Sequence, residues 1–172
     1  MNTDLKALSV QQPWARFITE GIHVSKDILG NNIEGYFEKK NYENRTWKTK
    51  FRGWVLIHAP LRIDRSAIEF LERRFHTDVV EYHKLISQYE PVGGIVGAAY
   101  ISDCLPLQEV SEQEIWASGP YCFKIEKAIS LAFQPCKGAL SFFRPEVSDW
   151  YLLTAAEMIR KFEQTEGGNH GI

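Results

Sequence analysis

The sequence predicts an α+β domain: a small mixed β-barrel with helices around it. Several short runs rich in Val, Ile, Phe and Trp are separated by Gly and Pro, which is typical of strands in small barrels. Helical patterns lie around these runs, which favours a barrel over a doubly wound parallel sheet. The chain has 172 residues and is 44% hydrophobic, enough for one core. We expect one domain over residues 1–165 and a flexible tail over residues 166–172.

The first elements are predicted to be a strand and a helix. Residues 7–10 (ALSV) have a strand pattern, and residues 11–21 (QQPWARFITEG) have the spacing of a helix, with Pro13 in the first turn and Gly21 at the end. Turn signals and a lack of sustained periodicity over residues 21–38 then predict a long loop, a candidate lid.

The middle of the chain predicts two strands and two inserted helices. Strand patterns occupy residues 41–49 and 53–60, and helical spacing follows in residues 65–75 and 79–89. The glycine-rich run 91–106 is expected to be a strand that another backbone or a ligand approaches closely.

The last third predicts a strand, a turn and a helix. Residues 119–131 have a strand pattern, and residues 134–145 form a turn followed by a short apolar segment. A C-terminal amphipathic helix is expected to begin after a cap at Ser148 or Asp149.

Positive charge is concentrated in one short stretch of a chain whose formal net charge is −2. Residues 39–52 contain one acid, Glu43, and six basic residues: Lys39, Lys40, Arg45, Lys48, Lys50 and Arg52. If the stretch is a strand, Glu43, Arg45 and Trp47 share one face. A carboxylate, a guanidinium and an aromatic plane together suit a planar polar ligand such as a nucleobase. The alternative is a solvent-facing strand with a surface ion pair and Trp47 as core filler.

Two further segments carry polar groups. Residues 9–15 (SVQQPWA) place hydroxyl and amide groups at a helix N-terminus, where a polar ligand could dock or where Ser9 or Gln11 could simply cap the helix. His58 alternates with Leu56 and Trp54, a pattern more typical of a satisfied core histidine than of a catalyst, and it is assigned no role.

Several classes of function are not indicated. The three cysteines lack the close pairs of a zinc site, and reduced thiols are expected; no metal and no cofactor is predicted. No apolar run approaches the ~18 residues needed to cross a bilayer and no signal peptide is recognisable, so a cytoplasmic protein is expected. Generic enzyme motifs are missing.

Four motifs in this order resemble the ASCH domain family: PWA, ENRxW, RGxxxIHA and GxIVG. The resemblance covers most of residues 5–145 and implies a PUA-like barrel with a ligand cleft between the barrel and the first helix. The family's GxKxxExR element matches Lys40, Glu43 and Arg45 here, with Lys39 as a rival for the lysine and with an insertion after Gly21. The resemblance also implies an opposite wall and a mouth, formed by Ser9, Gln11, Pro13, Trp14, Lys137 and Gly138.

The resemblance implies binding of RNA, of another single-stranded nucleic acid or of a nucleotide. Lys48, Lys50 and Arg52 are then expected to contact phosphates, and Arg45 and Trp47 a base. One alternative is an enzyme, a metal-independent ribonuclease or a hydrolase of acylated nucleosides, in which Lys40, Glu43 and Tyr42 are the candidate catalytic residues. Glu43 stands where a catalytic relative has a threonine, so that hydroxyl nucleophile is missing. The other alternative is a protein-interaction module.

Overall fold

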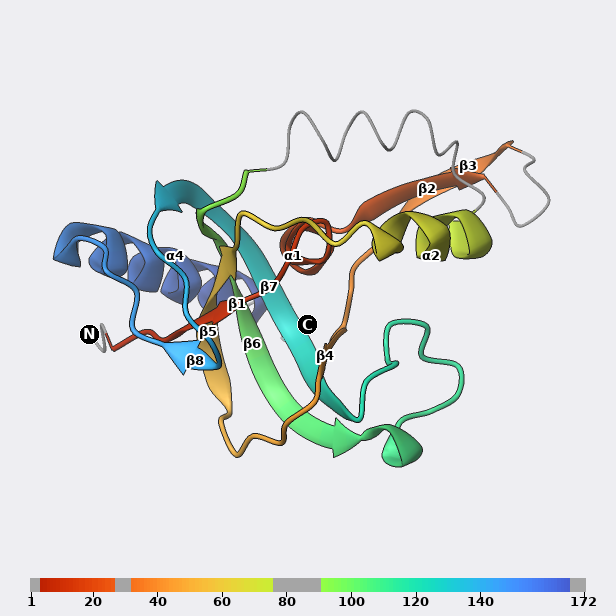
Figure 1. The fold of residues 1–172 in the computed structure, drawn as a ribbon. Coiled ribbons are helices and arrows are strands. Elements are labelled where there is room, and N and C mark those ends of the chain that lie inside the picture. Colours follow the sequence, from red (N-terminus) through yellow and green to blue (C-terminus); the bar gives the residue numbers. More distant parts are fainter. Residues whose placement is uncertain (1–3, 27–31, 76–90, 168–172) are drawn as a thin grey trace.

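The computed structural model describes residues 4–26, 32–75 and 91–167, which form an α+β fold around a six-stranded mixed sheet. The strand order is β4-β7-β6-β5-β1-β8, and the sheet curves into a half-barrel (Figure 1). A separate two-stranded sheet, β2-β3, extends away from it. The predicted barrel with surrounding helices is therefore confirmed in its coarse form.

The centre of the sheet is antiparallel. It consists of β5 (Gly53–Ala59), β6 (Gly94–Pro106) and β7 (Tyr121–Pro135), with the short β4 (Tyr42–Arg45) at the outer edge of β7. On the other side β1 (Ala7–Ser9) pairs parallel with β5, and β8 (Phe142–Phe143) pairs antiparallel with β1. The predicted strands all form, but the strand predicted over residues 41–49 ends at Arg45, and β8 forms in what was predicted as a short apolar segment after a turn.

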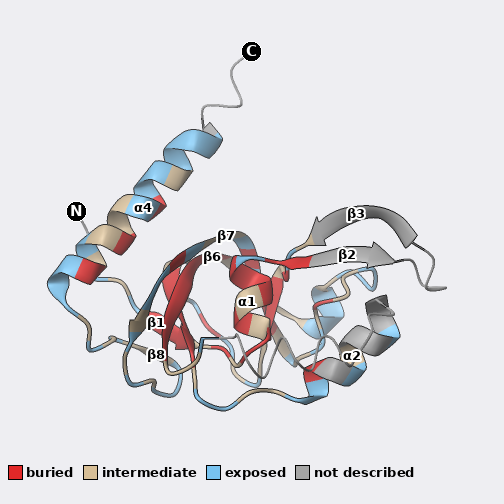
Figure 2. Ribbon diagram, turned by 90° about the horizontal axis from the view of Figure 1, so that it is seen from above, coloured by how far each residue is buried: buried red, intermediate tan, exposed pale blue. Residues whose placement is uncertain are grey.

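The first helix, α1 (Trp14–Thr19), crosses the concave face of the sheet. A Cβ at Gly97 of β6 would lie 2.4 Å from the Thr19 methyl carbon, so only glycine allows this close crossing. The expectation that the glycine-rich strand admits a close neighbour is confirmed. Figure 2 shows that α1 is among the most buried parts of the chain.

The segment after Gly21 is not the irregular loop that the turn signals predicted. It contains β2 (Ile22–Lys26) and β3 (Asn32–Glu38), which pair antiparallel from Ile22 opposite Glu38. The hairpin register depends on pairing between residues far apart in the segment, which a search for local periodicity does not detect.

Two helices flank the sheet. The α2 helix (Ser66–Phe75) lies between β5 and β6, as predicted; the second inserted helix, expected at residues 79–89, falls outside the described residues. The α4 helix (Asp149–Gly167) is capped by the Ser148 hydroxyl, which accepts a hydrogen bond from the Tyr151 amide at 3.2 Å. It packs Tyr151, Ala155 and Ile159 on the convex face of the sheet and ends two residues inside the predicted tail.

The two edges of the half-barrel, β4 and β8, are joined by side chains rather than by a strand ladder. Trp47 follows β4, and its ring lies 5.1 Å from the Phe123 ring of β7 and 5.5 Å from the Phe142 ring of β8. We call this contact region, formed by Trp47, Phe51, Phe123 and Phe142, the seam. Trp47 is therefore partly buried and packs against the core.

None of the helices in the described residues is long and apolar enough to cross a membrane.

Candidate functional site

A cavity of about 1040 Å³ opens between α1, α2, β4 and the ends of β1 and β5. Two loops, at residues 115–118 and 136–140, complete its wall. Eight of the residues predicted from the sequence line it: Ser9, Gln11, Trp14, Lys40, Glu43, Arg45, Lys137 and Gly138. The structure thus brings together residues that are up to 129 positions apart in the chain.

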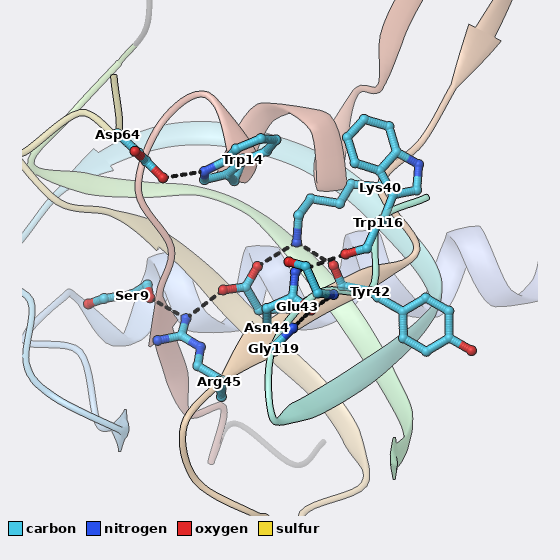
Figure 3. Close-up of polar contacts among 11 residues, drawn as sticks. Ser9, Trp14, Lys40, Tyr42, Glu43, Asn44, Arg45, Asp64, Trp116 and Gly119 are labelled. Carbon is cyan, nitrogen blue, oxygen red and sulfur yellow. Dashed lines mark hydrogen bonds and ion pairs between the residues drawn. The ribbon is translucent and has the colours of Figure 1, made fainter. Parts of the chain in front are cut away.

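Glu43, on β4, is the centre of a buried group of charges that also contains Lys40 and Arg45 (Figure 3). One carboxylate oxygen lies 2.8 Å from Lys40 Nζ, and the other lies 3.0 Å from Arg45 Nη2. The exposed fractions of the Lys40, Glu43 and Arg45 side chains are 4%, 11% and 19%. One acid therefore holds two cations, and the group has a surplus positive charge at the cavity wall.

Lys40 connects β4 to α1. Its Nζ also donates a hydrogen bond to the Tyr42 carbonyl and lies 5.9 Å from the centre of the Trp14 ring, while its backbone amide donates to the Phe17 carbonyl at 2.9 Å. These contacts fix the amine in its place and engage it as a donor.

Arg45 spans the opening of the half-barrel. Its Nη2 donates a 2.6 Å hydrogen bond to the backbone carbonyl of Ser9, at the end of β1. Its Nε is buried and has no hydrogen-bond partner among the described residues. Arg45 therefore links both sides of the cavity and retains an unused donor.

Aromatic rings form the opposite wall. Trp14 contacts Phe70 of α2 and Trp116 edge to face, with ring centres 5.5 Å and 6.4 Å apart. Trp14 Nε1 donates to Asp64 at 2.8 Å, and Asp64 also caps α2 through the Ser66 amide. Burial raises the pKa of Asp64, but hydrogen bonds from Trp14 and Ser66 and the charge of Arg62 outweigh burial and hold this pKa below its usual value. The starts of α1 and α2 are joined in this way.

Strand alternation places Asn44 on the face opposite Glu43 and Arg45, yet Asn44 also lines the cavity. Its amide nitrogen donates to the Trp116 carbonyl at 2.8 Å, and its amide oxygen accepts from the backbone of Ser118 and Gly119. Asn44 therefore fixes the loop that carries Trp116. Asn44, Asp64, Phe70 and Trp116 were all missed by the sequence analysis, because only the fold brings them together.

Ser9 and His58 meet where β1 and β5 end. The Ser9 hydroxyl lies 3.2 Å from His58 Nδ1 and 3.1 Å from the Ala139 carbonyl, and His58 Nε2 lies 3.2 Å from the Cys136 carbonyl. His58 is only 2% exposed, and burial lowers its pKa, so the ring is neutral at pH 7. The expected satisfied core histidine is confirmed, but this histidine also lines the cavity.

The remaining predicted residues lie outside the cavity. Pro13 precedes α1, and the Tyr42 side chain packs in the core with Phe17 and Cys122. The predicted common face of Glu43, Arg45 and Trp47 does not form, because the strand ends at Arg45 and Trp47 turns into the seam. The loop between β4 and β5 carries the three remaining cations: Lys48 and Lys50, which are exposed, and Arg52, which pairs with Asp103 at 2.6 Å.

All three cysteines are free thiols, and no group of His, Cys, Asp and Glu within the described ranges is arranged to hold a metal ion. No protein-family model matches the chain, and no curated protein matches it either.

Proposed function

We propose that the cavity binds a nucleotide or the end of a short RNA strand, as the resemblance to PUA-like ASCH domains implies. The observation that carries the proposal is the position of the Lys40–Glu43–Arg45 group beside the Trp14 ring. Phosphate or base-edge acceptors pair with fixed cationic donors, and bases stack on aromatic rings.

The size and charge of the cavity support a small anionic ligand. A volume of about 1040 Å³ is at the upper end of the range for small-molecule sites, so a nucleotide fits. The lining has four basic side chains, Lys40, Arg45, Arg73 and Lys137, and three acidic ones, Glu43, Asp64 and Glu69. With a surplus of one positive charge, we expect about one phosphate contact and a slope of about −0.7 for log affinity against log salt concentration.

The enzymatic alternative built on Lys40, Glu43 and Tyr42 has less support. The Tyr42 side chain lies in the core away from the cavity, and the Lys40 amine is engaged as a donor. Binding by Lys40 and Arg45 requires no change in these contacts.

The test compares two double variants that each remove two exposed positive charges. Arg73→Ala/Lys137→Ala removes them from the cavity lining, and Lys48→Ala/Lys50→Ala removes them from the β4–β5 loop. Fluorescence anisotropy at low salt measures the affinity for a labelled dinucleotide and for a ten-nucleotide RNA.

We expect the cavity variant to bind the dinucleotide at least fivefold more weakly and the loop variant to bind it like the wild type. For the ten-nucleotide RNA both variants weaken binding, because a longer strand reaches Lys48 and Lys50. Equal losses of dinucleotide affinity in the two variants would indicate unspecific attraction and would contradict the proposal.

A further inference from the structure

The Ser9 hydroxyl lies between two acceptors at the cavity wall, His58 Nδ1 and the Ala139 carbonyl. The hydrogen bonds of the His58 ring decide which ring nitrogen carries the proton. His58 Nε2 faces the Cys136 carbonyl, which can only accept, so Nε2 must donate. In the neutral ring Nδ1 is then an acceptor 3.2 Å from Ser9 Oγ, and it shares the single hydroxyl proton with the Ala139 carbonyl, 3.1 Å from the same oxygen. This is the arrangement of a serine beside a general base whose other nitrogen is held by a third group.

We propose that Ser9 is a nucleophile towards acyl esters, with His58 as its general base and the Cys136 carbonyl as the group that orients His58. Ser9 and His58 both line the cavity, so a ligand there reaches the hydroxyl. The inference concerns a reaction and does not depend on whether the ligand is a nucleotide.

The reaction follows from the positions of the protons. Ser9 Oγ attacks the ester carbonyl carbon while its proton passes to His58 Nδ1, and the carbonyl oxygen becomes an oxyanion. When the carbon–oxygen bond to the alcohol breaks, Nδ1 gives the proton to the leaving oxygen. Water, activated by Nδ1, then hydrolyses the acyl-serine to the acid and free Ser9.

The surroundings fit this chemistry. Arg45 donates to the backbone carbonyl of Ser9, so a positive charge lies next to the residue on which the oxyanion would form. A Cβ at Gly138 would lie 2.4 Å from His58 Cε1 and 3.1 Å from Ser9 Oγ, so glycine lets the loop at residues 136–140 pass close to the dyad without a side chain between the dyad and a ligand. Two exposed leucines, Leu61 and Leu140, line the cavity and can receive an apolar acyl group.

Within the described residues, no charged side chain is among the causes that shift the pKa of His58. The ring packs against Phe143 of β8, and Cys136, whose thiol pKa is raised by burial, follows β7. Lys137 lines the same cavity. We therefore expect the reactivity to fall as the pH drops through the lowered pKa of His58, where Nδ1 becomes protonated.

The test is labelling of the full chain with a small alkyl fluorophosphonate, whose phosphorus is attacked by an activated serine with loss of fluoride. We expect one label, mapped to Ser9 by mass spectrometry of the digested protein. Ser9→Ala should abolish the label, and His58→Gln should slow labelling by a factor of about 100 or more, the usual contribution of a general base. Ser118→Ala is the matched control, because Ser118 lines the same cavity and is expected to be dispensable.

The wild-type result is decisive even if a variant fails to fold. No label on wild-type Ser9 at pH 8, or a label at Ser118 instead, overturns the inference, as does unchanged labelling in a folded His58→Gln variant. Dinucleotide affinity is measured separately. A failure to label Ser9 therefore leaves the proposed binding function standing, and a failure to bind the dinucleotide leaves the proposed reactivity of Ser9 standing.

Discussion

Replacing Glu43 with glutamine removes the charge that holds Lys40 and Arg45 together. The side chain keeps its size, but an amide N–H now faces one of the two cations, and the other cation pairs only with a neutral oxygen. Lys40 is 4% exposed, so water cannot fully replace the lost carboxylate. The variant therefore leaves two largely buried cations whose positive charges are no longer balanced by an acid.

The expected loss is about 3 kcal/mol of unfolding free energy, the lower end of what breaking a buried ion pair costs, because Lys40 keeps the Tyr42 carbonyl and Arg45 keeps the Ser9 carbonyl. For a domain of this size, that corresponds to a fall of roughly 6–12 °C in Tm. Glu157→Gln is the matched control. Glu157 also pairs with two cations, Arg160 at 2.6 Å and Lys161 at 3.7 Å, but on the exposed face of α4.

The assay is urea unfolding followed by tryptophan fluorescence and circular dichroism, with both variants measured beside the wild type. Glu43→Gln should lower the midpoint clearly at an unchanged slope, whereas Glu157→Gln should leave the midpoint within error, since exposed ion pairs contribute little. If the two variants behave alike, burial is not what gives the Glu43 group its energy, and the reasoning is refuted.

Three further predictions follow from the same contacts. Gly138→Ala places a methyl group against His58 and should lower the unfolding free energy by about 1–3 kcal/mol through overpacking, as measured by urea unfolding. The same variant should suppress fluorophosphonate labelling, as measured by mass spectrometry. Trp47→Ala should cost about 3–5 kcal/mol in the same unfolding assay but leave dinucleotide affinity unchanged, because the ring packs in the seam; a loss of affinity in the folded variant would contradict this. Stability should fall as the pH drops below about 6.5, since unfolded His58 takes up a proton that the folded ring resists. His58→Gln should flatten that part of the unfolding profile, and an unaltered profile would show that His58 does not cause it.

Local patterns were sufficient to predict most elements of the fold. The apolar runs at residues 53–60 and 91–106 and the helical spacing at residues 65–75 correspond to β5, β6 and α2. In each of these elements, the spacing of the apolar side chains along the segment shows which face is buried, so the element is predictable without knowing its neighbours in the fold. The cap at Ser148 was predictable for the same reason.

Contacts between residues far apart in the chain explain which side chains the local patterns misplaced or missed. Trp47 has the spacing of a third strand residue after Glu43 and Arg45, but Phe123 and Phe142 attract its ring into the seam. Asn44 lies on the cavity wall because it fixes residues 116–119, which are more than 70 positions away. His58 could have been linked to Ser9 only with the register of β1 on β5, which pairs these two residues directly.

The cavity lies where the half-barrel is not closed by backbone pairing, so a bound ligand should change the free energy of unfolding. Arg45 of β4 and the Ser9 carbonyl of β1 are the polar link across that opening, beside the apolar seam. A ligand that contacts Arg45 and Lys137 at once adds a second link between the two sides. Because it binds the folded chain only, it should raise the unfolding free energy by about 2.7 kcal/mol at a concentration of 100 times its Kd. The size of that increase, compared with the Kd measured by anisotropy, tests whether the ligand binds to the native half-barrel alone; a much smaller increase would mean that binding does not require the two sides to be joined.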